Sequence, residues 1–146
     1  MQTMITNQLR ILVDTHLKAL KSACGIKEIG YRRASDQKMY PHVVWEIVGI
    51  DPVDMGRADY TIHFDVWGRR EVEVFNIMDA IVKDLEFLNE PQWGILPTFY
   101  NMSSGTVDDP DKTIIHGIVR IDCQVYDTEV TDKAILEKEL VNGNYH

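Results

Sequence analysis

The sequence is poor in cysteine, has fewer basic than acidic side chains and contains no long apolar run. Its two cysteines, Cys24 and Cys123, resemble neither a disulfide framework nor the close ligand pairs of a metal site. We expect both to be reduced thiols of a cytosolic protein. No apolar run reaches the ~20 residues that span a bilayer, and residues 1–10 lack the charged-then-apolar order of a signal peptide. The sequence therefore predicts a protein that is made in the cytoplasm, stays soluble and has no membrane partner.

The shortage of basic side chains limits the kinds of partner that the chain can bind. It has 15 Lys and Arg against 23 Asp and Glu, which gives a net charge of −8. Proteins that grip nucleic-acid phosphates or read base sequence usually present a basic face. The composition argues against such a binder, but it leaves open a surface that nucleic acid merely passes.

Recognisable catalytic motifs are also missing. The chain has no phosphate loop, no G-x-S-x-G, no H-E-x-x-H and no dinucleotide-binding fingerprint. We therefore assign the chain no catalytic residue, no metal and no cofactor.

The most informative stretch is residues 59–90, which predict one strand followed by one helix. Tyr60, Ile62, Phe64 and Val66 alternate with polar residues, as in a strand with one buried face. From Glu71 onward the apolar spacing changes to three or four residues, which is typical of a helix. The predicted helical stripe consists of Val74, Phe75, Met78, Ile81, Val82, Leu85 and Leu88. The two apolar faces should cover each other.

The rest of the chain predicts a second helix and three further strands. The helix is expected over 6–23 and strands over 40–50, 93–102 and 113–126, with Pro97 implying an edge strand or a bulge. Segment 27–37 is interpreted as a solvated loop or a weak edge strand. The turn formers of 49–58 are expected to join two strands as an antiparallel hairpin, and 103–112 is expected to be a loop.

Together these elements predict an α+β fold in the order α-β-β-α-β-β. We expect a mostly antiparallel sheet of about four strands with both helices packed on one face. Residues 1–126 would form a single domain, since a chain of 146 residues suffices for one core. Residues 127–146 would be an acidic tail that could include a short helix.

The polar face of the predicted sheet carries the only site-like group of residues. His63 and Asp65 project from one strand and Arg120 and Asp122 from another, so they converge if the strands are neighbours. A metal held by His63, Asp65 and Asp122 is one hypothesis. We favour an ordinary half-exposed sheet, whose alternate positions are polar in any case.

Large aromatic residues on this face suggest a protein interface. Trp67 is in phase with His63 and Asp65, Tyr126 is in phase with Arg120 and Asp122, and Trp45 belongs to a strand that is apolar on both faces. The candidate subunit interface consists of Trp45, His63, Asp65, Trp67, Arg120, Asp122 and Tyr126. An equally weighted alternative is that the first helix or the tail covers these aromatics.

The remaining reactive residues receive no chemical role. Cys123 lies in the apolar phase of its strand and is expected to be a small buried hydrophobe. His16 is expected to be a partly buried helix residue, and His42 and His116 stand alone. The acidic loop with Asp108, Asp109 and Asp111 lacks the spacing of a calcium loop and is predicted to be flexible.

Several local runs resemble the tail terminator, or tail completion, proteins of long-tailed phages and prophages. They are Tyr-Pro-His-Val-Val-Trp at 40–45, Asp-Tyr-Thr-Ile at 59–62, Asp-Val-Trp at 65–67, Ile-Met-Asp-Ala-Ile at 77–81 and Arg-Ile-Asp-Cys-Gln-Val-Tyr at 120–126. The resemblance covers 40–126 and rests on structural rather than catalytic motifs. Residues 27–38 and the tail have no counterpart in it.

The resemblance implies a non-enzymatic virion protein that forms a hexameric ring. Such a ring caps the tail tube, ends its polymerisation and offers a docking surface to the head or neck. Its partners would be other copies of itself, the tail tube protein and a head-tail connector, with DNA only passing through the channel. It would be found in the virion, and in the host cytoplasm during assembly. Our own inference for the tube and neck contacts is the set of loop residues Asp51, Asp54, Asp108, Asp109 and Asp111.

Two other functions are compatible with the sequence. One is a different structural protein of a phage neck or head-tail joint, which would share the fold class. The other is a small α+β enzyme or ligand-binding domain that uses the His63 and Asp65 face.

Overall fold

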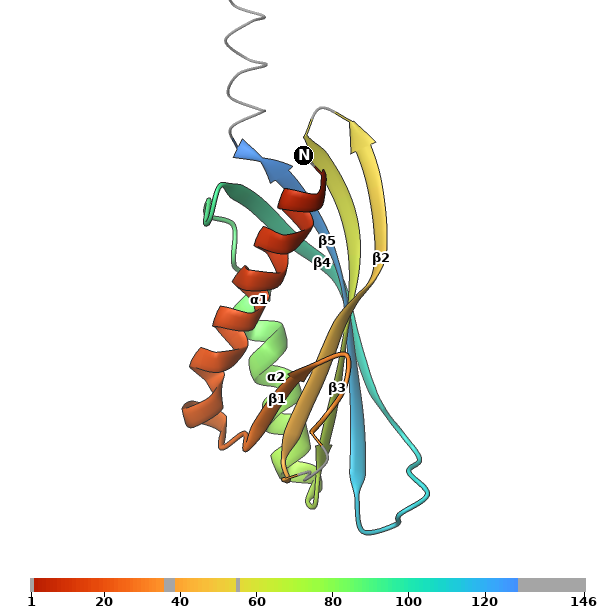
Figure 1. The fold of residues 1–146 in the computed structure, drawn as a ribbon. Coiled ribbons are helices and arrows are strands. Elements are labelled where there is room, and N and C mark those ends of the chain that lie inside the picture. The colour runs from red at the N-terminus through yellow and green to blue at the C-terminus, as the bar shows by residue number, and fades with distance from the viewer. Residues whose placement is uncertain (1, 36–38, 55, 129–146) are drawn as a thin grey trace, which may run out of the picture.

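A computed structural model describes residues 2–35, 39–54 and 56–128 of the chain. Its elements follow one another as α1 (Gln2–Cys24), β1 (Glu28–Tyr31), β2 (His42–Asp54), β3 (Arg57–Gly68), α2 (Glu71–Glu86), β4 (Ile95–Val107) and β5 (Ile115–Asp127) (Figure 1). Neither helix in these ranges is long and apolar enough to cross a membrane. The expected acidic tail and its short helix lie outside the described residues, apart from 127 and 128.

The strands form one sheet in the order β1-β2-β3-β5-β4. All neighbours are antiparallel except β1 and β2, which are parallel. The predicted α+β class is therefore confirmed, but the sheet has five strands where about four were expected. The additional strand is β1 at the edge of the sheet, in the segment interpreted as a solvated loop or a weak edge strand. Because β1 has only four residues, it is too short to show an alternating pattern in the sequence.

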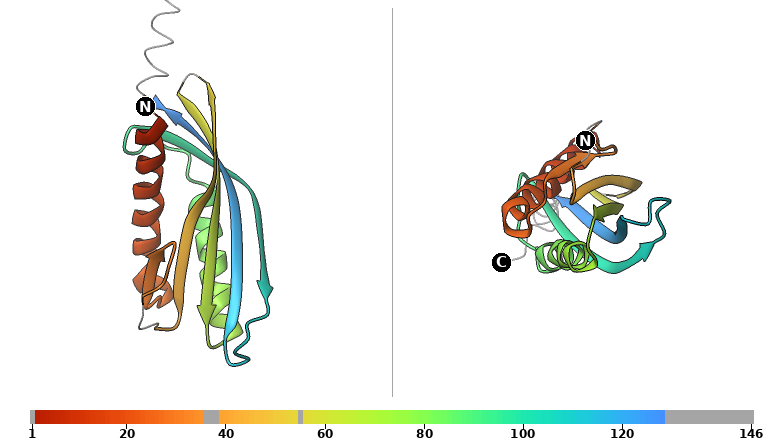
Figure 2. Two further views of the ribbon diagram at one scale, coloured as in Figure 1. Left: turned by 45° about the vertical axis from the view of Figure 1, so that its right-hand side comes forward. Right: turned by 90° about the horizontal axis from the view of Figure 1, so that it is seen from below.

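Both helices pack on the same face of the twisted sheet, and the opposite face carries no helix among the described residues (Figures 1 and 2). The buried side of β3 shows why: from Ala58 to Gly68 every second residue is buried and the intervening ones are half-buried. An apolar strand face must be covered, and the matching stripes of α1 and α2 cover it.

The strand-to-helix unit at 59–90 forms as predicted, with one residue misplaced. The side chains of α2 that face the sheet are Val74, Ile77, Met78, Ile81 and Leu85. Phe75, assigned to the stripe, is 42% exposed, since Ile77 occupies the buried position of that turn. The helix lies so close to β5 that a Cβ added at Gly117 would overlap the Met78 sulfur. This contact is a packing constraint that only glycine satisfies without rearrangement.

Two segments expected to be turn or loop extend the strands. The antiparallel hairpin expected at 49–58 is confirmed, but most of its residues are strand, because β2 continues to Asp54 and β3 begins at Arg57. β4 continues to Val107, which takes half of the predicted loop 103–112 into the sheet. These strand ends are identified by their backbone pairing, since their sequences are rich in turn formers and small polar residues. The interpretation of Pro97 is confirmed, because β4 is an edge strand with a bulge between Tyr100 and Ser103.

The centre of the core is an aromatic contact between β2 and β3. The Trp45 ring lies 6.1 Å from that of Phe64 in a stacked arrangement and meets Tyr31 edge-on at 4.8 Å. Trp45 is 1% exposed and Phe64 is fully buried. Trp45 therefore belongs to the core, and its assignment to an exposed subunit interface was wrong. The reason is that its phase in β2 matches Val43 and Ile47, which face the helices.

We expect Phe64→Ala to lower the free energy of unfolding by about 3–5 kcal/mol, because it leaves a cavity beneath Trp45. Phe87→Ala is the matched control, since Phe87 is 76% exposed, and its effect should be within about 0.5 kcal/mol. Urea denaturation followed by Trp fluorescence measures both. Equal losses in the two variants would contradict the described core.

Candidate functional site

The face of the sheet that carries no helix is the candidate site, and we call it the open face. Its residues alternate with the core residues of β2, β3 and β5. The open face consists of Val44, Glu46, Asp59, Thr61, His63, Asp65, Trp67, His116, Ile118, Arg120, Asp122, Gln124 and Tyr126. The strands that carry these polar residues, β3 and β5, are neighbours in the sheet: His63 lies opposite Arg120, and Thr61 lies opposite Asp122.

One end of the open face holds a stack of rings drawn from three strands. Trp67 is sandwiched between His42, at a centroid distance of 4.8 Å, and His116, at 4.4 Å. Both contacts are nearly parallel, with interplanar angles of 22° and 21°. His116 Nε2 lies 2.8 Å from an oxygen of Asp65, which fixes the outer ring of the stack. The result is a rigid aromatic surface.

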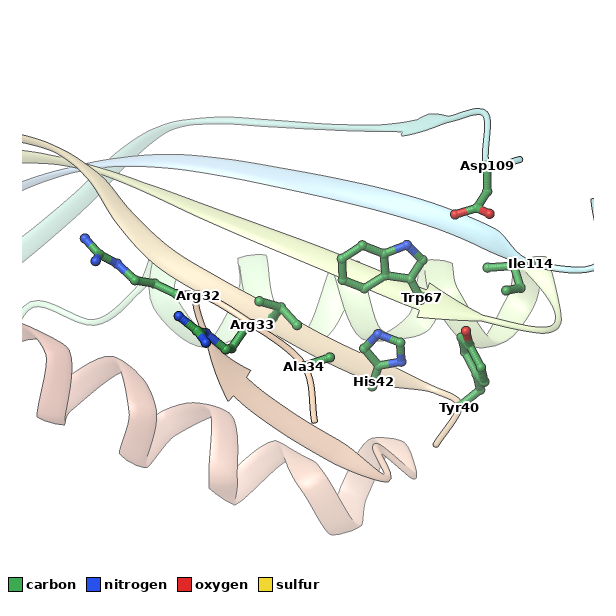
Figure 3. A pocket seen from close by; sticks show the side chains of 9 residues that line it. Arg32, Arg33, Ala34, Tyr40, His42, Trp67, Asp109 and Ile114 are labelled. Atoms are coloured by element: carbon green, nitrogen blue, oxygen red, sulfur yellow. The ribbon is translucent and has the colours of Figure 1, made fainter. Parts of the chain in front are cut away.

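A cleft of about 520 Å³ opens beside this stack (Figure 3). Its apolar part consists of Tyr40, Val44, Trp67 and Ile114. Arg32, Arg33 and Ala34 form one wall and Asp109 stands on the opposite side. A cavity of this volume, mostly apolar with a few charged groups at its rim, is the usual form of a binding site. We call it the arginine cleft.

Backbone hydrogen bonds hold the arginine wall against the sheet. The Arg32 N–H donates to the Trp45 carbonyl at 2.9 Å, and the Ser35 N–H donates to the Glu28 carboxylate at 2.7 Å. The second bond stabilises the charged carboxylate and lowers the pKa of Glu28. Arg32 itself has a φ of 71°, so the chain turns sharply as β1 ends. The wall is therefore placed by β1, the short strand at the edge of the sheet.

The middle of the open face is used for pairing between side chains. Asp122 accepts hydrogen bonds from Thr61 at 3.2 Å and from Asn101 at 2.7 Å. Asp65 is bound to His116, and it lies opposite Ile118 rather than Asp122. Within 2–35, 39–54 and 56–128, no group of three His, Cys, Asp or Glu side chains could hold a metal ion. The structure thus gives the His63, Asp65 and Asp122 hypothesis no geometric support.

A cation–aromatic contact lies at the far end of the open face. The Arg57 guanidinium lies 5.8 Å from the centre of the Tyr126 ring and also binds Asp59 at 3.2 Å. Tyr126 and Trp67 thus occupy opposite ends of the same face, separated by the length of β3. Of the seven predicted interface residues, Trp45 alone lies on the other side of the sheet. Whether the other six form an interface is a prediction that the fold does not test.

The predicted loop residues fall at the two ends of the sheet. Asp51 and Asp54 lie in β2, close to the turn at 55–56. Asp108, Asp109 and Asp111 follow β4 at the opposite end (Figure 1). Asp111 accepts hydrogen bonds from the backbone N–H and the hydroxyl of Thr113 at 2.9 and 2.7 Å, which lower its pKa. The acidic loop, predicted to be flexible, therefore contains local hydrogen-bonded structure.

Sequence reasoning missed three residues of the stack and cleft: Tyr40, His42 and His116. His42 and His116 were given no role because they are isolated in the chain. Their register explains the error, since both residues lie opposite Trp67 on adjacent strands. The available signal was a tryptophan, Trp67, in the polar phase of β3, but it did not reveal which strands flank β3. His16 is partly buried, as expected, and its Nδ1 lies 2.8 Å from Asp84 in α2.

No protein-family model matches the chain, and no curated protein matches it. Among solved structures, the chain is similar to a component of the virion of a native gene transfer agent particle. The TM-score is 0.59 at 12% identity, over 84% of this chain and 97% of the other. The likeness concerns the fold: nearly the whole of that component has the arrangement described here.

The burial of Cys123 predicts that its thiol does not react with reagents in the native protein. Cys123 is fully buried in β5, and burial raises its pKa because a thiolate is poorly solvated there. We expect a disulfide reagent such as DTNB to modify Cys24 in the native protein and to reach Cys123 only on unfolding. Cys24→Ser should then show no fast-reacting thiol, whereas rapid modification of Cys123 in that variant would contradict its placement in the core.

Proposed function

We propose that this protein is a virion structural protein that assembles as a ring and caps a phage-like tail tube. The observation that carries the proposal is the fold, which the chain shares over most of its length with a component of a gene transfer agent virion. The local runs resembling tail terminator proteins lie in β2, β3, α2 and β5, which form the framework of this fold. Residues 1–126 would act as one domain and the acidic residues from 127 as its tail.

The open face supports self-association. It carries Trp67 at one end and Tyr126 at the other, and no helix covers it among the described residues. In a ring, each copy contacts its two neighbours through two different patches. This heterologous contact is repeated by rotation until the ring closes. The open face supplies one patch, and a different surface of the same chain supplies the other. We propose six copies, as in the resembled family.

The net charge of −8 supports a channel that does not hold DNA. A basic lumen would bind the phosphate backbone and slow its passage. The two ends of the sheet would face the axial neighbours of the ring. The β2–β3 turn lies at one end and the loop after β4 at the other, so tube and neck proteins would meet different acidic segments.

Deleting the gene from its source genome tests the proposed function directly. We expect particles with tail tubes of uncontrolled, excessive length, visible by negative-stain electron microscopy, and restoration of normal length by the gene supplied in trans. Tails of normal length that lack heads would instead indicate another neck or head-tail joining protein. Normal, infectious particles would refute a structural role.

We expect Trp67→Ala to weaken ring formation, because it removes the central ring of the aromatic stack on the open face. Native mass spectrometry over a concentration series should show a discrete hexamer for the unaltered chain and smaller species for the variant. Trp93→Ala is the control, since it removes a tryptophan side chain, 46% exposed, that lies outside the open face. Unchanged association of Trp67→Ala would count against this face as an interface.

A further inference from the structure

The end of the β2–β3 hairpin has an unusual surface. Val48, Ile50 and Val53 are 50%, 53% and 47% exposed, and all three lie in β2 beyond or at the bulge that follows Ile47. Its partners in β3, Ala58 and Tyr60, are buried, and the Tyr60 hydroxyl lies 2.8 Å from Thr6 Oγ1 of α1, so the segment forms an edge of the sheet beside α1 (Figure 1). We call residues 48–54, the last part of β2, the arm. Exposed apolar side chains gathered on one strand edge are typical of a contact surface.

The arginine cleft lies at the other end of the same two strands. His42 begins β2 and Trp67 nearly ends β3, and the two residues are paired. The arm is the last part of β2. At about 3.3 Å per residue, Asp51 lies about 30 Å along β2 from His42 in the cleft. Because both belong to one continuous strand, an arm cannot fold back into the cleft of its own chain.

The chemistry of the two surfaces is complementary. The arm combines apolar side chains with the acidic residues Asp51 and Asp54, and Asp51 is exposed. The cleft combines an apolar floor with Arg32 and Arg33 on one wall. Asp109 stands on the opposite wall, so only the side formed by residues 32–34 attracts an acidic partner. Its volume of about 520 Å³ accommodates a few aliphatic side chains.

We infer that the arm of one copy of this chain inserts into the arginine cleft of a second copy. Val48, Ile50 and Val53 would cover Tyr40, Trp67 and Ile114, while Asp51 would meet Arg33. The inference rests on the proposed ring, whose interface it specifies. Arm and cleft are different surfaces, so the contact is heterologous and leaves one free arm and one free cleft on every open chain of copies. Closure into a ring satisfies both.

Charge reversal tests the contact, because mixing gives a result that misfolding cannot produce. Arg33→Glu gives a chain whose arm and cleft are both acidic, and Asp51→Lys gives one whose arm and cleft are both basic. Each variant alone should associate roughly tenfold more weakly or worse, through a lost ion pair and added repulsion. An equimolar mixture should form alternating oligomers, and the double variant should assemble by itself. Native mass spectrometry resolves the species by mass.

The controls carry the same changes of charge elsewhere. Asp79→Lys and Lys83→Glu alter exposed residues of α2, outside both the arm and the cleft. They should leave association unchanged, and a mixture of the two should associate no more strongly than either variant alone. If the cleft and arm variants associate like the unaltered chain, or if their mixture and the double variant show no recovery, the contact is refuted.

Cross-linking provides a second, independent readout. In a Cys24→Ser background, Ile50→Cys combined with Ala34→Cys should form a ladder of covalent oligomers when oxidised with diamide. Ile50→Cys combined with Lys83→Cys should not. Oligomers without the expected ladder would refute the arm contact and leave the ring intact, and a chain that stays monomeric and uncross-linked would refute the contact too. The gene-deletion experiment judges the capping function separately, because tail length is measured without reference to the arm.

Discussion

The structure depends on the burial of one face of a sheet by two helices. The apolar face of β3 lies at the centre, with Trp45 and Phe64 in contact above it and α2 packed so closely that position 117 accommodates only glycine easily. Because α1 and α2 both lie on this side, the other face receives no cover from the described chain. The asymmetry that stabilises the fold is also what leaves a surface for recognition.

That surface has different chemistry along its length. At one end, rings from β2, β3 and β5 stack on one another and the arginine wall set by β1 creates a cleft. In the middle, the Asp122 carboxylate accepts hydrogen bonds from Thr61 and Asn101. At the other end, Arg57 covers Tyr126. A single pleated face thus has a cleft at one end, a hydrogen-bonded polar centre and a cation–aromatic contact at the other end.

Those parts of the fold that bury apolar residues could be predicted from the sequence. The alternation from Tyr60 to Val66 and the helical spacing after Glu71 each reflect a buried face, and both elements occur where expected. The full extent of β2 and β4 could not be predicted, because their outer parts are rich in turn formers and small polar residues. The candidate site was found only in part: the phase of Trp67, Asp65 and Asp122 identified the face, whereas the stack required the register that places His42 and His116 beside Trp67. Trp45 was misassigned because both phases of β2 are apolar.

The outer edge of β4 has a consequence for how the free subunit behaves. Its 13 residues include no charged side chain, and the interruptions by Pro97 and the bulge lie in its first two thirds. The final stretch from Ser103 to Val107 is exposed, and it pairs with β5 on one side only. An unguarded strand edge of this kind templates the addition of further strands. The free chain therefore carries a built-in tendency toward sheet-mediated aggregation, which increases with its concentration.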